Sequence, residues 1–284
     1  MDRTAGVIGY GAARGRRVIW CHGGLSSAGD GALMDGAARR RGVRLVAVDR
    51  PGIGDGPRRR CLSVRAWAEQ VVDELGLADG EPVAVAGWSA GGPYALALAA
   101  VAPAHVSAVA AVASMHPLTE RRFRIELGLL ADRILLVTSR TAPRATRVGL
   151  APVRLVPPAL SGWVARRWAT PAEREALRPM AGVLADALGG ATRHGVAGVV
   201  DDYARLGSRW GIDLGRISTP VTIWHGAQDP MVPVEHGRHL TTLIPSARCR
   251  VLAGHGHFLP VTAGDEILSD LVGDTAVDER DPPA

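Results

Sequence analysis

Short apolar runs alternate with stretches of helical periodicity in the first 113 residues, and the same rhythm returns after residue 213. Runs bounded by charged or turn-forming residues predict buried strands, whereas apolar residues three or four positions apart predict helices. The predicted strands are Arg17–Cys21, Arg44–Asp49, Val83–Trp88, Val106–Ala113, Val221–His225 and Cys249–Leu252. The predicted helices are Gly31–Arg41, Ser63–Leu75, Gly91–Val101, Val234–Ile244 and Phe258–Leu271. This alternation predicts an α/β fold with a mostly parallel sheet and helices on both of its faces.

The alternation stops between Ser114 and Asp213. Arginine, alanine and leucine dominate this stretch, and prolines interrupt it repeatedly. Because proline starts or ends helices, we expect several helices joined by turns. We therefore predict a core formed by residues 1–113 and 214–272, a helical cap inserted at 114–213, and a disordered tail at 273–284.

Composition excludes several functional classes. The chain has 33 basic and 28 acidic residues, a net charge of +5, and every basic residue is arginine. Without lysine, a Schiff base, a pyridoxal phosphate anchor and a P-loop lysine are all excluded. The predicted cap holds 15 arginines against 9 acidic residues. Codon bias and an anionic substrate would each explain this excess of positive charge. No nucleic-acid-binding motif accompanies the charge, so we predict a small-molecule substrate and no nucleic acid partner.

Nothing in the sequence predicts export or a membrane span. Residues 1–17 contain no apolar signal region, and Cys21, Cys61 and Cys249 form no CxxC pair. An odd number of cysteines then suits buried free thiols in a reducing cytoplasm. The apolar stretch Val83–Met115 is broken at residues 91–93 and again at 103, so its pieces are too short to cross a bilayer.

The segment Gly87-Trp88-Ser89-Ala90-Gly91 matches the pattern G-x-S-x-G. The pattern alone is weak, but here a predicted strand leads into it and a predicted helix leads out. Small neighbours permit a sharp turn that lifts the Ser89 hydroxyl clear of the sheet. The start of the helix favours negative charge developing there. Ser89 is thus predicted to be a nucleophile; the alternative is an ordinary helix N-cap.

A serine hydroxyl needs a base to accept its proton. Of the candidate histidines, His257 follows the last predicted strand and directly precedes the final helix, so we predict that it is the base. His255 is the fallback. His22 and His225 end predicted strands and are expected to be structural groups held by hydrogen bonds.

The base needs a carboxylate to orient it, and Asp229 is the candidate. It lies in the loop after the predicted strand Val221–His225. The other suitable loop, after Ala113, offers no carboxylate before Glu120. The alternative for Asp229 is that it only caps the next helix.

The negative oxygen of an acyl-transfer intermediate needs two hydrogen-bond donors. We predict the backbone N–H of Ala90 as one of them. The other comes from the loop His22-Gly23-Gly24-Leu25, through the N–H of Gly24 or of Leu25.

A metal site is a poor alternative for this chain. His236 and His239 lie three residues apart on a predicted helix, but no third ligand accompanies them, so exposed surface histidines are expected. We predict neither a metal nor a cofactor.

The chain resembles the α/β-hydrolase superfamily over nearly its whole length, because five motifs occur in the order typical of that family. They are His22-Gly23-Gly24, Asp49-Arg50-Pro51-Gly52-Ile53-Gly54, Gly87–Gly92, Trp224–Asp229 with Val232-Pro233, and Gly256-His257-Phe258. The order serine, aspartate, histidine is also that of the family. The resemblance implies that Asp202 and Trp210–Leu214 lie near the end of the cap.

The sequence also departs from the family pattern. Only Gly6–Gly11 precedes the first clear strand, where the family usually has a two-stranded hairpin, and Gly54-Asp55-Gly56 replaces a usual Gly-x-Ser. Ser89 in place of an aspartate argues against haloalkane dehalogenase and epoxide hydrolase chemistry.

The predicted function is hydrolysis of an ester, lactone, thioester or amide bond of a small molecule, through an acyl-enzyme on Ser89. Met115, Trp163 and Trp168 are expected to influence specificity. Two alternatives stay open: a C–C bond hydrolase, lyase or cyclase that uses the same residues, and a ligand sensor without enzymatic activity.

Overall fold

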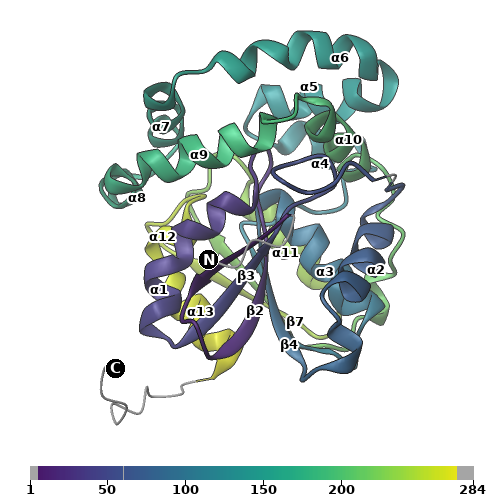
Figure 1. Ribbon diagram of the computed structural model, residues 1–284, viewed down its shortest axis with the longest axis vertical. Helices are drawn as coiled ribbons and strands as arrows, with labels where there is room; N and C mark the ends of the chain where they lie inside the picture. The colour runs from purple at the N-terminus through teal and green to yellow at the C-terminus, as the bar shows by residue number, and fades with distance from the viewer. Residues whose placement is uncertain (1–5, 60, 274–284) are drawn as a thin grey trace.

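The computed structural model describes residues 6–59 and 61–273. Within these residues a seven-stranded sheet forms the centre of the molecule (Figure 1), in the order β1-β3-β2-β4-β5-β6-β7. The strands are β1 (Val7–Gly11), β2 (Arg16–Cys21), β3 (Val43–Val48), β4 (Val83–Trp88), β5 (Val106–Val112), β6 (Val221–Gly226) and β7 (Ala247–Leu252). The β1 strand runs antiparallel to β3, and the other neighbouring pairs are parallel. The predicted fold class is confirmed.

Each central strand contributes side chains to two separate cores. In β2, Val18 and Trp20 pack into one core, whereas Ile19 and Cys21 pack into the other. Successive side chains of a strand point to opposite faces of the sheet. Because both faces are covered, these strands are apolar throughout rather than at every second position.

Helices cover both faces of the sheet (Figure 1). One face carries the 3-10 helix η1 (Ala28–Met34), α1 (Asp35–Arg40), α12 (Leu259–Thr262) and α13 (Gly264–Val272). The other face carries α2 (Val64–Glu74), α3 (Gly92–Val101) and α11 (Val234–Leu243). The short helices η2 (Leu77–Asp79) and η3 (Ser89–Gly91) lie in loops.

Two predicted helices differ from the structure. The helix expected at Phe258–Leu271 is wrong as a single element, because Ala263 leaves the helical region with φ of −134° and separates α12 from α13. The adjacent Gly264 packs close to Met34 of η1: a Cβ there would lie 3.2 Å from its sulfur. The helix expected at Gly31–Arg41 begins earlier, as η1, because the Ser27 hydroxyl accepts a hydrogen bond from the Gly29 N–H.

Between β5 and β6, the described chain forms helices and turns and no strand. The helices are α4 (Arg121–Glu126), α5 (Leu130–Thr141), α6 (Pro143–Leu150), η4 (Ala151–Leu155), α7 (Pro158–Arg167), α8 (Pro171–Ala176), η5 (Arg178–Met180), α9 (Ala181–Thr192), α10 (Ala197–Leu206) and η6 (Leu214–Arg216). Figure 1 shows α5 to α10 above one end of the sheet, and we call α4 to α10 the cap. Prolines occupy the first turn of α6, η4, α8 and η5, as their role as helix starters predicts. The domain boundaries at 114 and 213 stay a prediction.

The two ends of the chain are only partly described. The β1 strand is the one strand before β2 in residues 6–59, and it coincides with the Gly6–Gly11 segment singled out from the sequence. Of the predicted tail at 273–284, residues 274–284 lie outside the described residues.

Among the described helices, none is by itself long and apolar enough to cross a membrane; one bent pair, Pro143–Leu155 with Leu160–Arg167, reaches that length and composition only jointly.

Candidate active site

Ser89 lies in a sharp turn between β4 and α3. Its φ is +55°, in the left-handed region that residues other than glycine rarely adopt. The 3-10 helix η3 begins at Ser89 and continues directly into α3, so the side chain stands at the start of a helix. Strain of this kind is concentrated at functional turns.

The small residues around Ser89 are required by close packing. A Cβ on Gly91 would lie 2.0 Å from the carbonyl oxygen of Cys21, at the end of β2. A Cβ on Gly92 would lie 1.9 Å from the hydroxyl of Ser114, just after β5. The turn is therefore wedged between the ends of two strands, and larger side chains would displace it.

His257 and Asp229 are joined directly. The Nδ1 atom of His257 lies 2.8 Å from Oδ2 of Asp229, and both residues are buried. The other oxygen, Oδ1, accepts hydrogen bonds from the N–H groups of Met231 at 2.8 Å and Val232 at 2.9 Å. Asp229 thus fills both roles considered for it, since one oxygen contacts the imidazole and the other holds the following turn. Because Nδ1 faces the carboxylate, Nε2 is the ring nitrogen left for other partners.

Charges around His257 favour its protonated form. Burial on its own lowers the pKa of this imidazole, but the charge and the hydrogen bond of Asp229 outweigh burial, with help from Glu173 and Asp132. The pKa of His257 is consequently raised above the ordinary value of 6.5.

His257 lies beside the serine turn. Its ring centroid is 5.5 Å from that of Trp88, the residue before Ser89, and the Trp88 indole donates a hydrogen bond of 2.9 Å to the His257 carbonyl. Ser89, Asp229 and His257 follow β4, β6 and β7, whose carboxyl ends share one edge of the parallel sheet. The structure therefore brings the three predicted residues to the same edge.

His22 and His225 are held by hydrogen bonds, as expected. Nε2 of His22 accepts the backbone N–H of Arg50 at 3.3 Å, and Nδ1 lies 2.9 Å from the Gly23 carbonyl. Burial and the nearby Arg50 hold the pKa of His22 well below its usual value, so it stays neutral. His225 contacts the carbonyl of Val232 at 2.8 Å.

Three further histidines have hydrogen-bond partners other than Asp229. Nδ1 of His255, the fallback base, faces the carbonyl of Ala253 at 3.0 Å. His236 is buried and accepts a hydrogen bond from the His116 N–H, so the expectation of an exposed surface histidine is wrong for it. The reason is that α11 packs against β6 and the loop after β5. Within residues 6–59 and 61–273, no group of three or more His, Cys, Asp or Glu side chains is arranged to hold a metal ion. His236 and His239 are therefore not part of such a group.

The predicted oxyanion donors are neighbours. A Cβ on Gly24 would lie 3.5 Å from the Cβ of Ala90 and 2.9 Å from the hydroxyl of Tyr203. The buried Asp30 holds the loop around Gly24, because its Oδ2 accepts a hydrogen bond from the Gly23 N–H at 2.9 Å. The backbone of Gly24 therefore lies next to that of Ala90.

Arg50 is a site residue that sequence reasoning missed. Its guanidinium is buried and donates to the carbonyls of His22 at 2.6 Å and Gly23 at 2.7 Å, and it forms an ion pair of 2.9 Å with Asp202 of the cap. In a trans peptide the N–H points away from the C=O. The contact with the Gly23 carbonyl therefore directs the Gly24 N–H away from Arg50. The motif that contains Arg50 was visible in the sequence, but its partner was not.

Three cap residues near the site were also missed. The hydroxyl of Tyr203 donates a hydrogen bond of 2.7 Å to Asp132, and burial raises the pKa of both groups. Glu173 lies against the loop that carries His257. A capping-box pattern, Thr170 followed three residues later by Glu173, was visible in the sequence. Nothing in the sequence showed which part of the core the cap would face.

The residues expected to influence specificity lie in different surroundings. Met115 is buried and Trp168 is half-buried, whereas Trp163 is 63% exposed. Such exposure does not fit a side chain that encloses a substrate.

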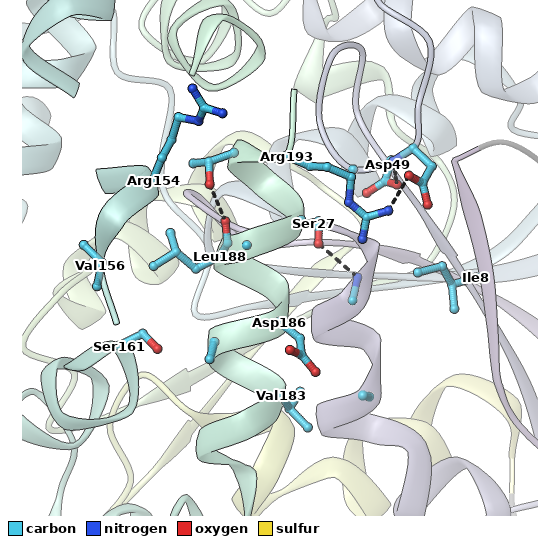
Figure 2. A pocket seen from close by; sticks show the side chains of 18 of the residues that line it. Ile8, Ser27, Asp49, Arg154, Val156, Ser161, Val183, Asp186, Leu188 and Arg193 are labelled. Carbon is cyan, nitrogen blue, oxygen red and sulfur yellow. Dashed lines mark hydrogen bonds and ion pairs between the residues drawn. The ribbon is translucent and has the colours of Figure 1, made fainter. Parts of the chain in front are cut away.

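A cavity of about 700 Å³ lies between α9 and η1. Figure 2 shows Asp186 and Arg193 on the cap side of this cavity and Ile8 and Ser27 on the core side. Its lining, as far as the chain is described, includes none of the three predicted catalytic residues. The cavity is therefore separate from them.

The cysteines do not compete with Ser89 as nucleophiles. All three thiols are free, but only Cys21 is buried, so the expectation of burial is wrong for the half-buried Cys61 and Cys249. Burial raises the pKa of each thiol, to about 12 for Cys21. None is a thiolate at neutral pH.

The model of the "Alpha/beta hydrolase family" matches residues 18–270 of the chain. Two solved structures share its fold. The enol-lactonase from Burkholderia xenovorans LB400 has a TM-score of 0.66 at 16% identity, over 94% of this chain and 94% of that one. A thermophilic esterase from Thermogutta terrifontis has a TM-score of 0.65 at 16% identity, over 93% of this chain and 90% of that one. At such identities the likeness concerns the fold alone.

A curated relative matches a shorter segment. Rhodomycin D methylesterase DnrP from Streptomyces peucetius is 34% identical over 65 residues. This segment spans 23% of the present chain and only 22% of the methylesterase. The match is local and does not transfer that protein's activity.

Proposed function

Since the chain belongs to the alpha/beta hydrolase family, we propose that it is a serine hydrolase that cleaves an ester-like bond of a small molecule through an acyl-enzyme on Ser89. The observation that carries this proposal is the 2.8 Å contact between His257 and Asp229, beside a serine held at a φ of +55°. A buried imidazole and carboxylate next to a strained serine turn form the arrangement that activates a neutral hydroxyl.

The proposed reaction has two halves. In the first, Ser89 Oγ attacks the substrate carbonyl while Nε2 of His257 accepts the serine proton, and Asp229 stabilises the resulting imidazolium. The imidazolium then protonates the leaving group, and the ester bond breaks. In the second half, His257 removes a proton from water, which attacks the acyl-enzyme. The imidazolium then returns a proton to Ser89 Oγ as the bond between Oγ and the acyl carbon breaks, which releases the acid and restores Ser89 and neutral His257.

The N–H groups of Ala90 and Gly24 are the proposed oxyanion donors. Of the two candidates in the loop after β2, Gly24 is favoured over Leu25, because the Arg50 contact with the Gly23 carbonyl orients the Gly24 N–H. A charge-assisted bond to one end of a peptide also polarises the N–H at its other end. Each such donor typically lowers the barrier by about 3 kcal/mol.

Carboxylic esters and lactones are the substrates to test first. The curated relative is named a methylesterase and one structural relative an enol-lactonase, and both names denote action on ester bonds. We propose this class ahead of thioesters and amides.

A panel of p-nitrophenyl esters of graded acyl length tests the proposal. We expect hydrolysis of at least one ester, with an initial burst of p-nitrophenol as the acyl-enzyme forms. Ser89→Ala should abolish the burst and lower the rate by about 10⁶-fold. Hydrolysis by Ser89→Ala at the wild-type rate would overturn the proposal. So would the absence of hydrolysis of every ester in the panel, which the ligand-sensor alternative predicts.

A further inference from the structure

The carboxylate of Glu173 is fully buried, at 0% exposure, on the short cap helix α8. Within the described residues it forms no ion pair with an arginine. Instead its oxygens accept three backbone N–H groups: Oε1 from Gly256 at 3.0 Å and Phe258 at 2.7 Å, and Oε2 from Thr170 at 2.9 Å. Burying a carboxylate is costly unless hydrogen bonds satisfy its oxygens, and here backbone donors do so.

Gly256 and Phe258 are the residues on either side of His257. A single oxygen of Glu173 therefore accepts the backbone N–H of both residues that flank His257. The Trp88 indole fixes the His257 carbonyl, and Asp229 fixes its ring. Glu173 supplies the one contact of this set that comes from the cap.

Capping of α8 does not account for this arrangement. A capping box requires only the local exchange between Thr170 and Glu173, which functions equally well at the protein surface. It requires neither complete burial nor two bonds to a loop more than 80 residues away along the chain. Gly256 also has to be small, since a Cβ there would lie 2.5 Å from Oε2 of Glu173.

We propose that Glu173 is a positioning residue for His257, which clamps the loop that carries the base and places a negative charge beside it. This inference rests on the proposed role of His257 as the base. Because Glu173 belongs to the cap, docking of α8 on the core completes the alignment of the base.

Several other ionisable groups face His257. His225 lies in β6, Asp229 lies in the loop after β6, and Asp132 belongs to α5. Asp229 acts most strongly on the imidazole, and Glu173 also contributes to raising its pKa. A substitution at Glu173 leaves the others in place, so its effect on the pH profile can be assigned.

The test measures the rate at which a fluorophosphonate modifies Ser89, as a function of pH, in the wild type and in Glu173→Gln. The rate should rise with pH as His257 loses its proton. Removing a nearby negative charge lowers the pKa of an imidazole, so the midpoint should move to lower pH by roughly half a unit to one unit. The plateau rate should fall about tenfold or more, because the loop is held less firmly. Glu173→Asp, which keeps the charge but shortens the side chain, should lower the plateau with a midpoint close to wild type.

Glu175→Gln is the matched control. It removes the same charge from the same helix, but its side chain is 72% exposed and pairs with Arg178. Its profile should match the wild type. If Glu173→Gln, with a wild-type melting temperature, gives the same midpoint and plateau as Glu175→Gln, the proposal is overturned.

If Glu173→Gln does not fold, Gly256→Ala tests the same contact between Glu173 and the loop that carries His257. The added methyl group displaces the carboxylate, so the plateau should again fall about tenfold; an unchanged plateau would overturn the clamp. A wild-type protein that is not modified at Ser89 would instead refute the proposed function. The two failures are therefore distinguishable.

Discussion

At the scale of single residues, the contact between Asp229 and His257 sets the pH range of the proposed activity. Only the neutral imidazole can accept the serine proton, and the pKa of His257 is raised above 6.5. Activity should therefore be present above that raised pKa and be lost as pH falls through it.

Asp229→Asn should lower kcat/KM by about 10⁴-fold, because an amide favours the wrong tautomer of the imidazole. Losing the carboxylate charge should also move the acidic midpoint to lower pH. Thermal unfolding of the same variant separates this effect from the loss of the turn that Oδ1 of Asp229 supports. Activity within tenfold of wild type in a folded variant would contradict the assigned role.

Arg50 and Asp202 form a buried ion pair whose disruption should be costly. Arg50→Met leaves the more distant Arg205, at 3.6 Å, as the cationic partner of the Asp202 carboxylate, beside the hydrogen bond from the Tyr94 hydroxyl. Removing one partner of a buried pair typically costs about 3 kcal/mol or more. The free energy of unfolding in urea measures this loss.

Arg65→Met is the comparison, since Arg65 pairs with Glu69 at the surface. Exposed pairs contribute little, so this variant should stay within about 1 kcal/mol of wild type. Equal stability of the two variants would show that the pair between Arg50 and the cap does not stabilise the fold.

At the scale of elements, the turn between β4 and α3 depends on glycine. Gly91→Ala places a methyl group against the end of β2 and should destabilise the protein by about 2 kcal/mol, as overpacking does. It should also slow modification of Ser89 by a fluorophosphonate, since the turn shifts.

Gly182→Ala should have the opposite effect on stability to Gly91→Ala. Gly182 lies in α9, where a Cβ would meet no atom within 4 Å. This substitution should stabilise the protein by roughly 0.5–1 kcal/mol through helix propensity. Unfolding in urea measures both variants, and a Gly91→Ala variant as stable as wild type would contradict the packing account.

The sequence predicts elements best where local pattern and tertiary structure agree. The bounds of β4 match the prediction, because Pro82 precedes its apolar run, the turn at Ser89 follows it and both faces are buried. The break at Ala263 was not predicted; the residue next to it, Gly264, packs close to Met34 of η1. The order of strand ends likewise predicts that Ser89, Asp229 and His257 lie on one edge of the sheet.

At the scale of the whole molecule, the least predictable contacts join the cap to the core. Arg50 meets Asp202, and Glu173 meets Gly256, across long stretches of chain. A single sequence shows no pairing between such positions, and helical periodicity says only which face of a cap helix is apolar. Both contacts depend on how the cap lies over the sheet.

The cap and the core should differ in resistance to proteolysis. The segment from α6 to α7 exposes large apolar side chains, including Val148, Leu155 and Trp163, and Arg154 is exposed between them. Few buried contacts make local opening easy. Limited trypsin digestion followed by mass spectrometry should therefore give its first cuts, within the described residues, after arginines at 144–167. First cuts inside β2 to β4 would contradict this expectation.

Covalent labelling of the nucleophile tests the central claim most directly. The wild type and the variants Ser89→Ala, His257→Ala and His255→Ala are treated with a fluorophosphonate and digested, and the modified peptide is sequenced. The account predicts modification of Ser89 in the wild type, none in Ser89→Ala, strongly slowed modification in His257→Ala, and a nearly wild-type rate in His255→Ala. Modification at another residue, or equal rates in the two histidine variants, would contradict it.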